Sequence, residues 1–243
     1  MKMSDKKAAT RRKIINQAVQ LFSERGYEQT TMKQIAKAAE IGDATIYKYF
    51  PSKEQVLLGF LELRACDAIE QAAATDEFEY FDLQEKLQLL IDTLLESLLP
   101  DREFVAFCLE KFSQSPLFMM QDALRVKVLF QQAMHGYLTA AEETGELTDI
   151  PFKSSISNLL GEYVYGVVFY WIKDESEEFS NTTQMVDLSL GIVSVVLSSG
   201  LINRVSEFAG FMFKAHLFRM MSDSDGVLSM LKGLKSGMAG MRG

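Results

Sequence analysis

The chain has 243 residues, of which 48% are hydrophobic and 24% charged, the ordinary balance of a folded protein with a sizeable core. The net charge of −8 excludes a nucleic-acid partner for most of the chain, but residues 1–53 hold 11 Lys/Arg against 5 Asp/Glu, a local charge of +6. A basic head on an acidic body confines phosphate binding to the head.

Several classes of protein are disfavoured by what the sequence lacks. The two cysteines, Cys66 and Cys108, form no CxxC motif, which indicates reduced thiols and a cytoplasmic protein. The basic N-terminus has no apolar run behind it and is not a signal peptide. The charge-free stretch 188–203 has 16 residues, fewer than the roughly 20 of a membrane span. It is therefore predicted to be a buried helix.

An enzyme is also disfavoured. The two histidines, His135 and His216, are distant in the sequence, and we find no GxSxG, phosphate-loop, HExxH or CxxC motif. No nucleophile is placed beside a base, and no ligand set is spaced for a metal. We therefore expect no catalytic residues, no metal and no cofactor.

Taken in chain order, residues 1–9 are predicted to be a disordered basic arm, followed by a helix from about Thr10 to Arg25 that Gly26 ends. A second helix begins at Thr31, which forms a capping box with Gln34. After a break over residues 40–42, a third short helix runs over residues 43–50.

Pro51 stops the third helix, and Ser52 with Gln55 forms a second capping box that opens a long fourth helix. Further helices are predicted near 82–99, 101–113, 121–144, 153–174, 184–200 and 203–221. The tail 222–243 is predicted to be flexible, although its apolar and basic residues leave open that it lies on an anionic membrane surface.

The fold class is therefore all-α. We expect a basic arm (1–9), a three-helix helix-turn-helix domain (10–55), a larger helical ligand-binding and dimerisation domain (56–221) and the tail (222–243). Two short helices joined by a tight turn, packed on a third, are the plan of a DNA-binding helix-turn-helix. The residues that can reach groove edges or phosphates are Thr31, Lys33, Gly42, Asp43, Ala44, Thr45, Tyr47, Lys48, Tyr49 and Lys53.

The stretch that carries this plan reads AVQLFSERGYEQTTMKQIAKAAEIGDATIYKYFPSKEQVL. It resembles the N-terminal signature of the tetracycline-repressor (TetR) family of transcriptional regulators. The matching positions are Ala18, Leu21, Phe22, Gly26, Tyr27, Thr30, Thr31, Ile35, Ala36, Ala39, Ala44, Thr45, Ile46, Tyr47, Tyr49, Phe50, Ser52, Lys53 and Glu54.

Two residues depart from the family pattern. Glu40 stands where the family usually has Gly, at a turn that favours positive φ. Gly42 stands where the family usually has a Ser cap, although Gly is an acceptable N-cap. Glu40 and Asp43 also place negative charge near DNA, which is expected to weaken affinity or tune sequence choice.

The resemblance implies a homodimer that binds a palindromic double-stranded DNA operator and acts without a membrane. It further implies a repressor that a small apolar or amphipathic effector releases, although activation stays open. The effector pocket is predicted between the fourth helix and the helix at 153–174, with candidate ligand residues Phe107, Phe112, Met134, His135, Tyr165, Phe169 and Trp171. Each of these also has an ordinary interpretation as a core or surface side chain.

The run LLGEYVYGVVFYWIKD and the following TTQMVDLSL look like the last two helices of many family members, which form the dimer interface. Small residues repeat along the second of these helices and favour close helix packing, either within the chain or between subunits. The candidate dimerisation residues are Gly161, Tyr165, Val168, Gly191, Ser194 and Ser198.

Overall fold

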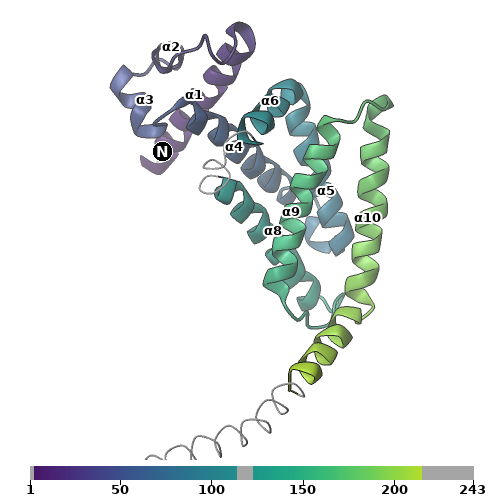
Figure 1. The fold of residues 1–243 in the computed structure, drawn as a ribbon. Helices are drawn as coiled ribbons and strands as arrows, with labels where there is room; N and C mark the ends of the chain where they lie inside the picture. The colour runs from purple at the N-terminus through teal and green to yellow at the C-terminus, as the bar shows by residue number, and fades with distance from the viewer. Residues whose placement is uncertain (1–2, 114–122, 215–243) are drawn as a thin grey trace, which may run out of the picture.

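The structure is a computed structural model that describes residues 3–113 and 123–214, and over these ranges it contains helices and no strand. Figure 1 shows a small head of helices at one end and a body of long helices packed side by side. This arrangement confirms the predicted all-α fold. The predicted flexible tail, 222–243, lies outside the described residues.

The head consists of α1 (Met3–Arg25), α2 (Met32–Ala38) and α3 (Asp43–Tyr49), packed on the start of α4 (Lys53–Ala73). Its core is formed by side chains that are fully buried, among them Ile14, Ala18, Ile35 and Ile46. Gly26 follows α1 with φ +83°, a left-handed conformation that costs glycine little and ends the helix as predicted.

The first helix begins much earlier than the sequence analysis predicts. Residues 3–9, assigned there to a disordered arm, form the opening turns of α1. Lysine and alanine at positions 6–9 are strong helix formers, and Asp5 lies in the first turn where the helix dipole favours a negative charge. The local propensity of this segment therefore outweighs its lack of an apolar face.

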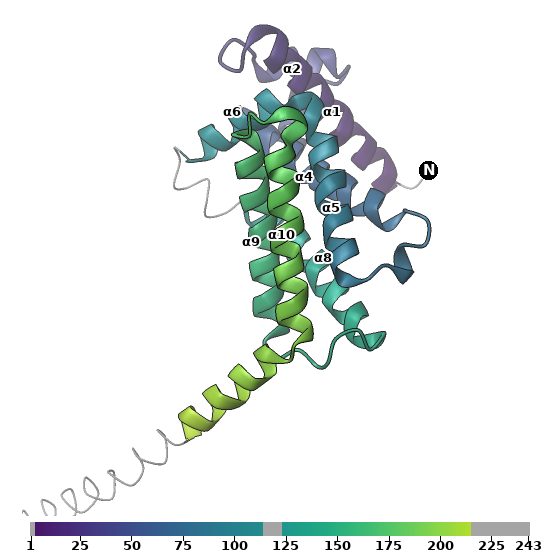
Figure 2. The ribbon, with the colours of Figure 1, turned by 90° about the vertical axis from the view of Figure 1, so that its right-hand side faces the viewer.

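The body follows the predicted series of helices closely. Its long elements are α5 (Leu83–Leu98), α6 (Arg102–Ser113), α8 (Ala123–Glu143), α9 (Lys153–Ile172) and α10 (Ser180–Ser198), joined by the short 3-10 turns η1 (Phe78–Tyr80), η2 (Leu99–Asp101) and η3 (Glu177–Phe179). A further helix runs over Leu201–Lys214. Figure 2 shows α9 and α10 lying side by side, with this last helix leaving the end of α10 that is far from the head.

The start of α10 is capped by Asp174, and this explains why the helix begins before the predicted residue 184. The Asp174 carboxylate accepts hydrogen bonds from the backbone N–H and hydroxyl of Ser176 and from those of Thr182, at 2.6–2.9 Å. These bonds hold the pKa of Asp174 well below its usual range. A carboxylate at the first turn also suits the helix dipole.

Arg102 ties α6 to the end of α9. Its guanidinium Nη2 donates to the carbonyl oxygens of Trp171, Ile172 and Asp174 at 3.0, 2.8 and 2.8 Å. The same guanidinium lies over the rings of Trp171 and Phe179, 5.4 and 4.9 Å from the centroids. It thereby supplies donors to carbonyls at the C-terminus of α9, the end of a helix where carbonyls run short of helical partners.

Candidate DNA-binding and effector sites

The turn between α2 and α3 is built as the sequence predicts. Thr31 caps α2 in a capping box with Gln34, and Gly42 is the N-cap of α3 without a side-chain bond. Glu40 has φ 55°, the positive value for which the family usually provides glycine. A non-glycine residue in this conformation carries strain.

The outer face of α3 is open to solvent. Lys48 and Tyr47 are exposed, as are Gly42, Asp43 and Ala44, whereas Thr45 and Tyr49 are half-buried. Ile46 and Phe50 are buried and anchor α3 to the head. Thr31 and Lys33, at the start of α2, are also exposed. The predicted DNA-contacting residues of α2 and α3 therefore lie on one end of the molecule, at the head (Figure 1).

Several cations of the head are paired with carboxylates of the same chain. Arg11 binds Glu62 at 2.6 Å, and Arg12 makes a two-pronged contact with Asp67. Lys13 pairs with Glu40 and lowers the pKa of that carboxyl. Part of the +6 charge of residues 1–53 thus serves to hold α1 on α4 and to neutralise Glu40.

Lys53, a predicted phosphate contact, is turned inward. Its ammonium donates to the Tyr27 carbonyl at 2.7 Å and lies 4.3 Å from the centroid of the Tyr27 ring. The Tyr27 hydroxyl donates to Glu54 at 2.9 Å, and burial with this bond raises the Tyr27 pKa. In this conformation the Lys53 ammonium links the start of α4 to Tyr27, in the loop that follows α1.

Gly59 on α4 lies directly beneath the end of α3. A Cβ at this position would come within 2.6 Å of Cε1 of the buried Phe50 ring and 3.2 Å of the Arg11 guanidinium. The Arg11 guanidinium in turn lies 5.2 Å from the Phe50 ring centroid. The absence of a side chain at Gly59 therefore allows α3 to seat on α4.

An apolar cavity lies between α4 and α9, where the sequence analysis places the effector pocket. Its volume is about 40 Å³, far below the roughly 300 Å³ of a typical ligand site. The lining residues are Leu61, Arg64, Ala65, Leu94, Leu98, Val105, Leu109, Val126, Phe130, Val164, Tyr165 and Val168. In the present conformation the cavity is too small for an effector.

Two of these lining residues carry polar atoms with unmet hydrogen-bonding capacity. The Tyr165 hydroxyl and Nε of Arg64 are buried and have no hydrogen-bond partner among the described residues. Nη2 of Arg64 binds Asp101 at 2.6 Å, which holds the guanidinium in place. Buried polar groups without partners are rare and point to a missing ligand or water. Sequence reasoning missed Arg64, because no motif or periodicity separates it from a surface arginine of α4.

The candidate ligand residues do not form one site. Tyr165 lines the apolar cavity. The Phe107 ring centroid lies 5.3 Å from that of Tyr27 in the head, and Phe112 of α6 packs against the core. Met134 and Trp171 are fully enclosed in the core. His135 is exposed, with Nδ1 3.3 Å from the Ser157 hydroxyl. Aromatic density alone could not separate pocket from core, since both need large apolar side chains.

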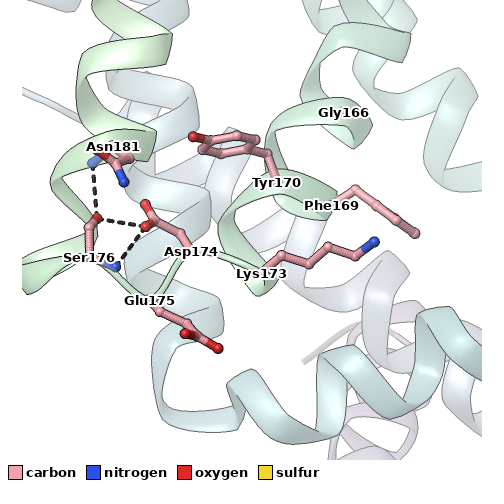
Figure 3. Close-up of a pocket in the computed structure, with 8 residues that line it drawn as sticks. All are labelled: Gly166, Phe169, Tyr170, Lys173, Asp174, Glu175, Ser176 and Asn181. Atoms are coloured by element: carbon pink, nitrogen blue, oxygen red, sulfur yellow. Dashed lines mark hydrogen bonds between the residues drawn. The ribbon is translucent and has the colours of Figure 1, made fainter.

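Phe169 belongs to a different, open hollow of about 660 Å³ at the end of α9. Figure 3 shows Phe169, Tyr170 and Lys173 along its rim and the hydrogen-bonded Asp174 and Ser176 beside them. The hollow is formed mostly by exposed residues of the α9–α10 surface, with the buried Asp174 beside them. It is therefore a feature of that surface and separate from the apolar cavity.

The candidate dimerisation residues divide between inside and outside. Gly161 is buried, and a Cβ there would meet the Gln131 backbone of α8 at 3.4 Å, so this glycine serves packing within the chain. Tyr165 and Val168 line the cavity. On α10, Gly191 and Ser194 are partly exposed and Ser198 is exposed. The large apolar side chains that face solvent are others: Leu159, Phe169 and Tyr170 on α9 and Leu188, Ile192 and Val195 on α10.

Two protein-family models match this chain, one over the head and one over the body. Residues 14–59 match the family described as bacterial regulatory proteins, tetR family, and residues 86–212 match the tetracyclin repressor-like C-terminal domain. The fatty acid metabolism regulator protein of Bacillus subtilis is 30% identical over 136 residues, which cover 56% of this chain and 70% of that protein.

Solved structures share the fold. A TetR-family transcriptional regulator from Syntrophomonas wolfei superposes with a TM-score of 0.59 at 20% identity, covering 78% of this chain and 96% of that one. The regulator FadR from Bacillus subtilis, solved in complex with stearoyl-CoA, gives a TM-score of 0.54 at 26% identity, covering 77% and 97%.

An exposed short helix on a three-helix head, set on a helical body, defines a helix-turn-helix DNA-binding protein. The two family matches are more specific. The chain belongs to the TetR family of transcriptional regulators.

Proposed function

We propose that this protein represses transcription as a homodimer bound to a palindromic operator, and that an amphipathic effector with a long apolar tail releases it. The observation that carries the proposal is the apolar cavity beneath the head, with its two unpartnered donors, Tyr165 Oη and Arg64 Nε. An effector that offers an acceptor oxygen next to an apolar chain would satisfy both features. A fatty acyl thioester has this chemistry.

The relatives support the same class of effector. The B. subtilis FadR structure holds stearoyl-CoA, and the B. subtilis relative named above is a regulator of fatty acid metabolism. A chain of that length needs far more room than about 40 Å³. Binding therefore requires the helices around the cavity to move apart.

Two of those helices also hold the head. On α6, Val105 and Leu109 line the cavity, while the Phe104 ring stacks on the Phe22 ring of α1 with 5.8 Å between the ring centroids. On α4, Leu61 and Ala65 line the cavity, and both lie within about two turns after Gly59, on which α3 rests through Phe50. Displacement of α4 and α6 by an effector would thus move the head, and with it the spacing of two heads on DNA.

The proposed dimer uses the outer surface of α9 and α10. Leu188, Ile192 and Val195 form a solvent-facing stripe on α10, each about 60–66% exposed. Monomeric proteins rarely leave large apolar side chains together in solvent. A two-fold contact would cover the stripe with its own copy.

The effector is tested with stearoyl-CoA on a fluorescent duplex that the protein selects from a random pool. We expect stearoyl-CoA to lower DNA affinity, and Tyr165→Phe to weaken stearoyl-CoA binding by about tenfold, the worth of one hydrogen bond of about 1.4 kcal/mol. The fold should keep its stability, because the lost hydroxyl has no partner among residues 3–113 and 123–214. Isothermal titration calorimetry and thermal unfolding measure the two effects.

Tyr137→Phe is the matched control. Its hydroxyl is also buried and has no partner in the described part of the chain, and burial raises its pKa to about 12, but Tyr137 does not line the cavity. This variant should bind stearoyl-CoA as the wild type does. If both variants lose stearoyl-CoA affinity equally, or if stearoyl-CoA does not change the DNA affinity of the wild type, the proposed effector site is contradicted.

A further inference from the structure

The helix over Leu201–Lys214 projects from the body with a bare apolar face. Figure 1 shows it leaving the lower end of α10, on the side away from the head. Leu201, Val205, Phe208 and Met212 are 50–65% exposed and follow one another at spacings of four, three and four residues. These spacings place them on one face of a helix, in the pattern of a helix that packs against another helix.

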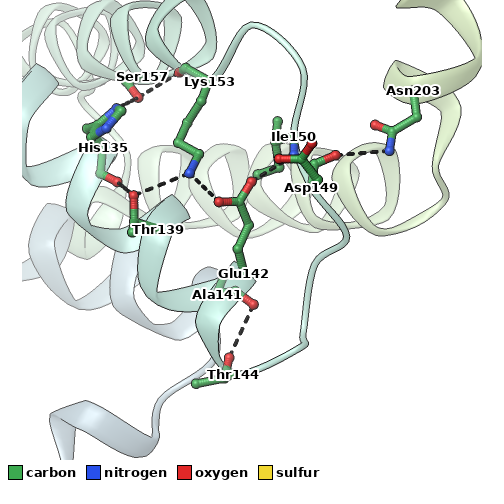
Figure 4. Close-up of polar contacts among 10 residues, drawn as sticks. All are labelled: His135, Thr139, Ala141, Glu142, Thr144, Asp149, Ile150, Lys153, Ser157 and Asn203. Atoms are coloured by element: carbon green, nitrogen blue, oxygen red, sulfur yellow. Dashed lines mark hydrogen bonds and ion pairs between the residues drawn. The ribbon is translucent and has the colours of Figure 1, made fainter. Parts of the chain in front are cut away.

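The base of this helix is fixed to the body. Gly200, with φ +68°, turns the chain after α10, and Asn203 Nδ2 donates to the Asp149 carbonyl at 3.0 Å. The loop that carries Asp149 is itself held, because Glu142 accepts the Ile150 N–H at 2.7 Å and pairs with Lys153 (Figure 4). The apolar face is thus presented in a defined direction.

The polar side of the helix argues against a lipid surface as the occupant. Its charged residues are Arg204, Glu207 and Lys214, a nearly neutral set that also has the exposed Phe211 among it. Helices that lie on anionic membranes are instead rich in lysine and arginine on this side. Among the described residues no single helix is long and apolar enough to span a membrane; Glu177–Ser198 joined to Leu201–Lys214 has the length and composition but is bent by 55°.

Continuity with α10 favours a second copy of the chain. The exposed stripe of α10 has the same four-and-three spacing through Leu188, Ile192 and Val195, and it ends just before the turn at Gly200. The two stripes therefore follow one another along the chain. An isolated helix of this length is marginal in water, so its order depends on packing.

We propose that a second copy of this chain covers the apolar face of helix 201–214, as an extension of the homotypic contact made by α9 and α10. The inference rests on the proposed homodimer. The match to the tetracyclin repressor-like C-terminal domain runs over residues 86–212 and so includes most of this helix.

The test uses the full-length protein and sedimentation velocity over a range of concentrations. Val205→Ser combined with Phe208→Ser removes the centre of the stripe and should weaken self-association by at least about tenfold, since two large apolar side chains lose their burial. Arg204→Gln combined with Glu207→Gln alters only the polar side and should leave association unchanged. Circular dichroism confirms that both variants stay folded.

Ile192→Asp on α10 separates the two proposals. If Ile192→Asp disrupts the dimer while the Val205/Phe208 variant associates as the wild type does, the proposal for helix 201–214 fails and the α9–α10 dimer stands. If Ile192→Asp leaves association intact, the α9–α10 dimer surface fails, and a loss in the Val205/Phe208 variant would then assign self-association to helix 201–214 itself and overturn its role as an extension of α9–α10. Binding to vesicles of phosphatidylcholine and phosphatidylglycerol is measured by co-sedimentation. If only the Val205/Phe208 variant loses this binding, and its self-association is unchanged, the apolar face belongs to lipid and the proposal is overturned.

Discussion

Thr45 and Lys48 lie one turn apart on α3 and differ in what they can reach. Thr45 is half-buried near the N-terminus of the helix, where its N–H bonds to the Gly42 carbonyl at 2.8 Å, and Lys48 is exposed near the end. In helix-turn-helix proteins the N-terminal residues of the second helix contact base edges. We therefore assign Thr45 to base recognition and Lys48 to a phosphate.

Thr45→Ala should cost about 1–3 kcal/mol per half-site on the operator and little on random DNA. Lys48→Ala should weaken both about equally and reduce the salt slope by about 1 per half-site. Fluorescence anisotropy on operator and scrambled duplexes at several salt concentrations measures both. Equal losses on the two duplexes for Thr45→Ala would contradict the assignment.

Glu40 combines backbone strain with an ion pair, and the two can be separated. Glu40→Gly relieves the positive φ of 55° and should raise the Tm by about 2–4 °C, as expected for relief of about 1 kcal/mol in a protein of this size. Glu40→Gln keeps the strain and, like Glu40→Gly, loses the charge that holds Lys13. A Tm for Glu40→Gly no higher than that for Glu40→Gln would show that this turn is unstrained.

At the scale of elements, the cap of α10 predicts a pH dependence. The pKa of Asp174 is lowered by its four hydrogen bonds, so its stabilising effect is fully present above the unfolded pKa of about 3.9. That effect is lost as the pH falls through the lower folded value. The Tm difference between the wild type and Asp174→Asn should therefore be constant near neutral pH and shrink below about pH 4. A difference that persists in acid would argue against the charged cap.

The helices could be predicted from the sequence because their signals are local. Thr31 with Gln34, Gly26 and Pro51 mark boundaries that the structure reproduces within a few residues. The arm at residues 3–9 was missed because helix propensity without an apolar face leaves no periodic signal. The early start of α10 was missed because its cap, Asp174, lies six residues before the first residue of the helix, Ser180, and is separated from it by η3.

The sites were less predictable, because they depend on which side of a helix faces the interior. The helix-turn-helix motif is enough to predict which face of α3 is exposed. It does not predict that the Lys53 ammonium donates to the carbonyl of Tyr27, which is distant in sequence. On α9, Gly161 and Val168 face inward while Leu159 faces out. That helix is apolar nearly all round, so periodicity could not assign its faces.

For the whole molecule, DNA binding should depend strongly on salt. A dimer with about 6–10 phosphate contacts should lose about 10³-fold or more in affinity between about 50 and 200 mM salt. Arg12→Gln should change this slope little, because Arg12 is already paired with Asp67, in contrast to Lys48→Ala. An affinity that is insensitive to salt would contradict the electrostatic role of the head.

The contact between Gly59 and Phe50 has a consequence for genetics. A Cβ at position 59 would come within 2.6 Å of the ring that seats α3, and that ring is buried, so it would have to shift within the core. Random mutagenesis screened for loss of repression should therefore recover substitutions at codon 59, although this residue lies beneath α3 and outside its exposed face. Second-site revertants of such alleles should include smaller side chains at codon 50, which would map the seat of α3 without any DNA complex.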